Sequence, residues 1–97
     1  MDESKEEDKV IDLAKVLFDR TKIKIIKELN QQPQYGFGLA KQLNLSSPTI
    51  SYHISKLSDL GLITAQRNEN KIFYQANQEL IEEALKSMSD MLIAKER

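Results

Sequence analysis

Residues 46–57, SSPTISYHISKL, place an unusual number of hydroxyl groups around one apolar helix face. Ile50, Ile54 and Leu57 lie at i, i+4 and i+7, the spacing of a single face. Serine and threonine are weak helix formers because their side chains compete for nearby backbone groups. Short hydroxyls, however, let a helix backbone approach a ligand closely while they donate or accept hydrogen bonds. The stretch predicts a helix whose outer face makes close polar contacts, and the base edges and phosphates of DNA fit that chemistry.

Two helices are expected before this stretch. Apolar residues recur at helical spacing from Val10 to Phe18, and Asp19 offers an N-cap for a second helix. In that second helix the residues expected to point inward are Ile23, Ile25, Ile26 and Leu29. Pro33 and the glycines of QYGFG end it in a turn.

The hydroxyl-rich helix is expected to be the second helix of a helix-turn-helix. LAKQL predicts a short helix before it, and Asn44 suits the left-handed backbone of a tight stop. Ser47 is then a good N-cap and Pro48 a good first helical residue. The helix runs over residues 47–60 and stops at Gly61.

Residues 62–76, LITAQRNENKIFYQA, change to a strand period around the polar turn RNEN, which predicts a two-stranded hairpin. Asn77 then caps a long helix that carries a continuous apolar stripe. The expected fold is mainly α with a small β-hairpin, a winged helix-turn-helix with an extra helix at each end.

Composition narrows the function further. The chain has 97 residues, no cysteine and one histidine, so disulfides, thiolate chemistry and the usual zinc ligand sets are excluded. There is no nucleophile motif or glycine-rich phosphate loop, which argues against an enzyme and a cofactor. No apolar run is long enough for a membrane, and no signal-peptide core is present, so we expect a cytoplasmic protein. Residues 1–8 read as a disordered acidic tail, and residues 9–97 as one domain.

Charge is segregated along the chain. The net charge is −1, but residues 20–76 carry +5 and the two ends together carry −6. A local basic surface is what matters for a nucleic-acid partner. Double-stranded DNA is therefore the expected partner of the middle segment. The residues expected to contact it are Ser47, Pro48, Thr49, Ser51, Tyr52, Ser55 and Lys56 on the helix, Lys41 before it, and Arg67, Asn68, Asn70 and Lys71 at the wing. Arg20, Lys22 and Lys24 are further candidates for neutralising phosphates.

The sequence resembles the ArsR family of bacterial transcriptional regulators. LFDRTKIKIIKEL is similar to the family's L-x-D-P-T-R-L-R-I-L-x-x-L, with Arg20 in place of proline. LAKQLNLSSPTISYHISKLSDLGLI is similar to its helix-turn-helix, with Asn44 in place of the turn glycine, and NKIFYQAN to its wing return. The resemblance implies a homodimer, joined by the first and last helices, that represses a promoter by binding an inverted repeat. An apolar stripe longer than one small domain can cover independently favours a dimer seam. The expected dimer residues are Leu13, Leu17, Leu80, Ile81, Leu85, Met88, Met91 and Leu92.

One departure from the family matters. Founding members sense metals through a C-V-C motif or through histidine and carboxylate ligands on the last helix, whereas this chain has Tyr35 and Phe37 at the cysteine positions and no histidine in that helix. The resemblance therefore implies no metal site, and the sequence names no effector. His53 has two readings, a DNA contact or a half-buried residue that bridges the helix to the wing. A winged-helix module that binds another protein and not DNA is the alternative function.

Overall fold

A computed structural model describes residues 3–93 and confirms the expected fold class. Within these residues lie five helices and one three-stranded antiparallel sheet of order β1-β3-β2. The elements are α1 (Glu3–Leu17), α2 (Arg20–Gln31), β1 (Gln34–Tyr35), α3 (Gly36–Leu43), α4 (Ser47–Asp59), β2 (Ile63–Asn68), β3 (Lys71–Ala76) and α5 (Gln78–Leu92).

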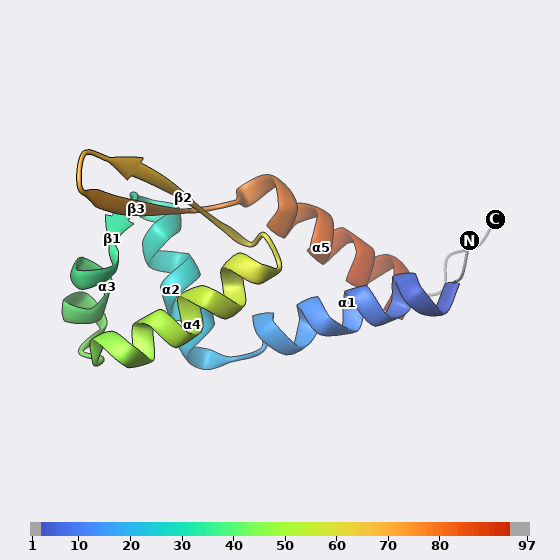
Figure 1. Ribbon diagram of the computed structural model, residues 1–97. Coiled ribbons are helices and arrows are strands. Elements are labelled where there is room, and N and C mark those ends of the chain that lie inside the picture. Colours follow the sequence, from blue (N-terminus) through green and yellow to red (C-terminus); the bar gives the residue numbers. More distant parts are fainter. Residues whose placement is uncertain (1–2, 94–97) are drawn as a thin grey trace.

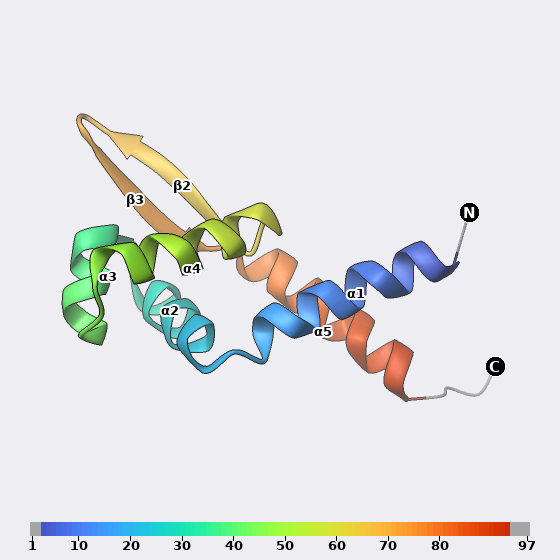
Figure 2. The same ribbon diagram turned by 60° about the horizontal axis from the view of Figure 1, so that its bottom comes forward.

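The chain forms a head and an arm. The head contains α2, α3, α4 and the sheet, and the arm consists of α1 packed along α5 (Figure 1). Figure 2 brings α4 to the front of the head, with the β2–β3 hairpin standing up behind it. The N-terminal end of α4 lies at the end of the head remote from the arm (Figure 1). The molecule is elongated as a result, with extents of 50 × 25 × 22 Å.

The first helix is longer than expected. It begins at Glu3, so residues 3–8 are helical where the sequence predicts a disordered tail, and residues 1–2 lie outside the described part of the chain. An acidic residue, Glu3, begins the helix, and negative charge in the first turn is favoured by the positive end of the helix dipole. Packing against α5 then supports the helix from Val10 onward.

The start of α2 confirms one expectation and corrects another. The Lys22 backbone N–H donates to Asp19 Oδ2 at 3.0 Å, so Asp19 is the N-cap. Ile23, expected in the core, is 40% exposed, whereas Lys22 is buried. The reason is geometric, because Ile23 lies about 160° around the helix from the fully buried Ile25.

The helix-turn-helix has the expected turn with its cap shifted by one residue. Asn44 adopts the left-handed conformation with φ 57°, and Gly61 ends α4 with φ 77°. The N-cap of α4 is Ser46, not Ser47, and its hydroxyl accepts the Thr49 N–H at 3.2 Å. Pro48 is then the second helical residue, a position where its missing N–H costs nothing.

The hairpin is confirmed, and a third strand joins it. β2 and β3 pair from Ile63↔Ala76 to Asn68↔Lys71, so Arg67 and Asn68 of the expected turn belong to β2 and the turn itself is residues 69–70. β1 was not expected: Gln34 and Tyr35 pair with Tyr74 and Phe73 on the free edge of β3. α3 correspondingly begins at Gly36, earlier than the LAKQL stretch, so QYGFG is a strand and a helix start and not a simple turn.

One core joins the head to the base of the arm. Its buried residues are Leu13, Leu17, Ile25, Leu29, Leu39, Ala40, Ile50, Ile54, Leu57, Leu62, Ile63, Ala84 and Met88. Asn77 connects the two parts: its side-chain oxygen accepts the Leu80 N–H, and its side-chain nitrogen donates to the Gly61 carbonyl at 2.9 Å. The expected N-cap of α5 therefore also fixes the end of α4.

Candidate nucleic-acid interface

The outer face of α4 carries a row of three serines. Ser47, Ser51 and Ser55 are spaced by four residues and are all exposed. The opposite face supplies Ile50, Ile54 and Leu57 to the core, with exposed fractions of 6% or less. The core contacts therefore anchor the helix along its length, and the serine row presents small hydroxyls to solvent.

A second row lies beside the serines. Pro48, Tyr52 and Lys56 are also spaced by four residues and are exposed, and the Tyr52 side chain is 58% exposed. The Lys56 ammonium lies over the Tyr52 ring, with Nζ 5.5 Å from the ring centroid. The exposure expected for Tyr52 is thus confirmed. Together the two rows form a surface that we call the α4 face: Ser47, Pro48, Ser51, Tyr52, Ser55 and Lys56.

Thr49 differs from the other predicted contact residues. It is half-buried, and its Oγ1 accepts a hydrogen bond from the Ser46 hydroxyl at 2.8 Å. Its backbone N–H is bonded to the same serine, and Pro48 has no N–H to offer. The Ser47 amide is consequently the donor that the first turn of α4 retains for a phosphate.

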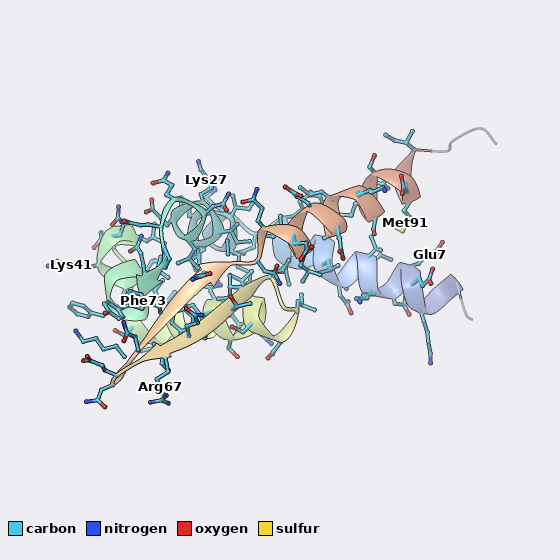
Figure 3. All side chains as sticks on the ribbon, turned by 90° about the horizontal axis from the view of Figure 1, so that it is seen from above. Glu7, Lys27, Lys41, Arg67, Phe73 and Met91 are labelled. Carbon is cyan, nitrogen blue, oxygen red and sulfur yellow. The ribbon has the colours of Figure 1, made fainter. Side chains whose placement is uncertain are left out.

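The wing divides its predicted residues between two faces. Arg67 projects away from the sheet (Figure 3). It pairs with Ile72, whereas Lys71 pairs with Asn68, so the register puts Lys71 on the opposite face of the hairpin. The Lys71 ammonium lies over the Tyr35 ring at 4.9 Å, and Tyr35 stacks on Phe73 with ring centroids 4.0 Å apart. Lys71 is therefore held against this aromatic pair, while Arg67 is the cation that extends from the hairpin. Asn68 shares the face of Lys71, and both Asn68 and Asn70 are exposed.

The remaining cations differ in accessibility. Lys41 points outward from α3 (Figure 3), and Arg20 and Lys24 are exposed on α2. Lys22 is only 8% exposed, so the expectation that it neutralises a phosphate is wrong. It lies at the third residue after its cap and shares a face with Ile25 and Leu29, a spacing that already indicated burial.

His53 is half-buried, as one of its two readings expects. The charged groups beside it, Asp19 and Lys22, belong to the start of α2. Its ring meets Tyr52 edge-on at 5.4 Å, and its Nδ1 is buried without a hydrogen-bond partner among the described residues. Burial, reinforced by the Lys22 ammonium, lowers the pKa of His53, and Asp19 only partly opposes this. The backbone N–H and the charge of Lys22 also lower the pKa of the Asp19 carboxyl, so Asp19 stays ionised while His53 titrates.

We expect His53 to make stability fall on mild acidification. Because its folded-state pKa lies below the ordinary value of 6.5, the unfolded chain binds the proton more readily as pH drops through that value. The melting temperature of the native protein should therefore decline from about pH 7.5 to about pH 5.5 more steeply than that of His53→Asn. Equal slopes in calorimetry of the two proteins would contradict this assignment.

The predicted dimer residues fall into three groups by burial. Leu13, Leu17 and Met88 are buried inside the protomer and leave little surface for a second copy, so their place in a dimer interface stays a prediction. They pack where α1 and α5 of the same chain meet. An apolar stripe in the sequence does not tell whether it packs against a helix of its own chain or against a second copy. Leu80 and Ile81 are half-buried. Leu85, Met91 and Leu92 are exposed by 54%, 38% and 75%.

Three exposed apolar residues of the arm and its base are absent from the predicted set of dimer residues. Ile11, Phe18 and Ile93 are exposed by 42%, 77% and 58%. In the sequence Phe18 continues the helical spacing of α1, but α1 ends at Leu17, which leaves the ring outside the core.

The described residues contain neither a metal-ligand cluster nor a membrane-spanning helix. Among the described residues no group of three histidine, cysteine, aspartate or glutamate side chains could hold a metal ion. At the positions where the resemblance places metal-binding cysteines, Tyr35 packs on Phe73 and Phe37 is 75% exposed. Phe37 therefore lies outside the core. Over residues 3–93, no helix has the length and apolar character to cross a bilayer.

Fold and surface together define a winged helix-turn-helix protein. Residues 19–65 match the family described as bacterial regulatory protein, arsR family. The chain is 33% identical over 70 residues to the arsenical resistance operon repressor of Staphylococcus xylosus, covering 72% of this chain and 67% of that protein. The chain therefore belongs to the ArsR family of bacterial regulatory proteins.

Two solved structures share the fold. An ArsR-like transcriptional regulator from Rhodococcus sp. RHA1 superposes with a TM-score of 0.80 at 22% identity, over 88% of this chain and 80% of the other. The second structure is the homodimeric winged helix-turn-helix DNA-binding domain of a possible ArsR-family regulator from Mycobacterium bovis. It superposes with a TM-score of 0.76 at 18% identity, over 96% of this chain and 87% of the other.

Proposed function

We propose that this protein is a homodimeric transcriptional repressor that binds an inverted-repeat operator in double-stranded DNA. The N-terminal half of α4 enters the major groove, and the wing contacts the backbone or the minor groove of the same half-site. In a helix-turn-helix it is the second helix, here α4, that reads base edges with its N-terminal residues.

The observation that carries this proposal is the exposed α4 face. Its serines are short enough for the backbone to come close to base edges, while their hydroxyls donate and accept. The other elements of the head also carry exposed cations, namely Arg20 and Lys24 on α2, Lys41 on α3 and Arg67 on β2. The acid-rich first and last helices form the arm, away from the N-terminal end of α4 (Figure 1). The charge distribution thus directs the head, and not the arm, toward phosphates.

The arm supports a dimer. α5 turns Leu80, Ala84 and Met91 toward α1, where they line a groove with Val10 and Leu13. Glu7 and Met91 lie on its two sides (Figure 3). Leu85 and Leu92, seven residues apart on α5, are exposed and do not line that groove. A second copy covers such a face in a two-fold dimer and pairs two α4 faces for two half-sites. The M. bovis domain is described as homodimeric and the S. xylosus relative as a repressor.

A salt titration tests DNA binding against the alternative of a protein-interaction module. Fluorescence anisotropy of a labelled duplex is measured at about 50 mM and about 200 mM salt. We expect affinity to fall steeply with salt because phosphate contacts release counterions. Absence of binding at low salt, or binding that ignores salt, would support the protein-interaction module instead.

We expect Arg67→Gln to weaken binding of all duplexes and to reduce the salt slope by about one, because one phosphate contact is lost. Gln66→Ala, a neighbouring exposed position on the other face of the hairpin, serves as the control and should leave the slope unchanged. An unchanged slope in Arg67→Gln would remove the wing from the interface.

A further inference from the structure

Lys22 is a cation whose side chain is mostly buried and whose ion pair is weak. Its side chain is 10% exposed, and its ion pair with Asp19 is long, with Nζ 3.9 Å from Oδ2. The buried part is mainly the alkyl stem, because the ammonium keeps contact with solvent, as long cationic side chains commonly do. A methionine of similar length would supply the same packing, so the charge of Lys22 calls for a role other than filling the core.

The Lys22 ammonium reaches the underside of the α4 face. Its Nζ lies over the Tyr52 ring, 5.7 Å from the centroid, although Tyr52 is on α4 and Lys22 on α2. The same ring receives the Lys56 ammonium at 5.5 Å and the edge of His53 at 5.4 Å. Tyr52 is nevertheless 58% exposed, so its outer part is available to a ligand while its ring is held from below.

We propose that Lys22 is a positioning residue for Tyr52, which it holds in the orientation that contacts DNA. The inference rests on the function proposed above. A cation over a tyrosine face is attracted by the ring quadrupole, and the attraction is stronger when the cation is partly desolvated. The Lys22 side chain is 10% exposed whereas Lys56 is exposed, so solvent weakens the attraction of Lys22 to the ring less than that of Lys56.

Orientation of the ring improves binding because an ordered side chain loses less freedom on association. Immobilising a flexible side chain at an interface costs about 0.5–1.5 kcal/mol, and a ring already held by Lys22 avoids part of this. Lys22 itself is too buried to reach a phosphate. Its effect on DNA therefore passes through Tyr52, in contrast to Lys56, which is exposed and contacts both the ring and any nearby phosphate.

A double-mutant cycle tests the proposal. Duplexes enriched from a random library by the native protein are titrated with Lys22→Met, Tyr52→Leu and the double variant. Lys22→Met should weaken binding about threefold to tenfold in the native background and have no effect in the Tyr52→Leu background. Its melting temperature should hold, since an apolar side chain of similar size replaces the packing of the buried lysine stem. Lys22→Arg should restore most of the affinity.

Lys56→Met is the matched control. It removes an exposed ammonium from the same ring, and it should lower the salt slope by about one, whereas Lys22→Met should leave the slope unchanged. If Lys22→Met lowers DNA affinity equally in the native and Tyr52→Leu backgrounds, or only together with a fall in melting temperature, the positioning role is overturned. The proposed DNA-binding function would still stand. Failure of the native protein to bind or enrich any duplex would overturn the proposed function and this inference together.

Discussion

Replacing Ser51 by glutamate is expected to weaken binding of the operator at least about a hundredfold, equivalent to about 3 kcal/mol. Ser51 lies in the middle of the exposed serine row of α4. A carboxylate there meets base edges and phosphates at close range, and its longer side chain holds the helix out of the groove. The fold should persist, because the site is exposed and glutamate is a better helix former than serine. Anisotropy titration gives the affinity, and circular dichroism the melting temperature.

Ser58→Glu provides the matched control for this change. Ser58 is an exposed serine of the same helix, but it lies in the last turn, away from the N-terminal half that enters the groove. The same added charge should reduce affinity by less than about threefold, as screened surface charges do. Equal losses from the two variants would indicate a general charge effect. Retained affinity in Ser51→Glu would show that the serine row does not face the duplex.

Replacing Leu85 by glutamate is expected to dissociate the dimer. Leu85 is 54% exposed in the protomer and belongs to the outward side of α5. Burial of one leucine side chain contributes about 1.5–3 kcal/mol to the free energy of association, and a two-fold dimer loses this contribution twice. The two introduced glutamates would also have to lose their hydration in the interface. The dimer dissociation constant should rise at least about a hundredfold in sedimentation experiments. Operator affinity should fall with it, because a monomer engages one half-site.

Lys86→Gln is the control for the dimer experiment. Lys86 is the next residue on α5 and is exposed, but it lies outside the apolar positions. It should leave the dissociation constant within about threefold of the native value. A Leu85→Glu protein that remains dimeric at the same concentrations would place the dimer contact on another surface. The exposed Phe18 and Ile11 would then be the next positions to change.

Local signals in this sequence predict the helix ends well. Asp19, Asn44, Gly61 and Asn77 each occupy the cap or stop position that their side chains favour, because a cap depends on a few adjacent residues. The shift from Ser47 to Ser46 arises where two serines in a row suit the same cap. The hairpin was predictable for a similar reason, since a polar turn separates two strand-like runs.

Features that depend on distant pairing were not predictable. β1 has two residues and therefore no period of its own; it exists because Tyr35 meets Phe73 on the edge of β3. The contact between Lys22 and Tyr52 likewise requires α2 and α4 to be in place. A stripe on one helix also does not reveal which residues face α1, as Met88 does inside the core, and which face outward, as Leu85 does.

Sequencing of the duplexes that the native protein selects from a random library tests the central claim most directly. Two copies joined through their arms, each with one α4 in a major groove, should enrich an inverted repeat whose half-site centres lie about one helical turn apart, or a multiple of it. Enrichment of a lone half-site, of direct repeats, or of no sequence at all would contradict the account.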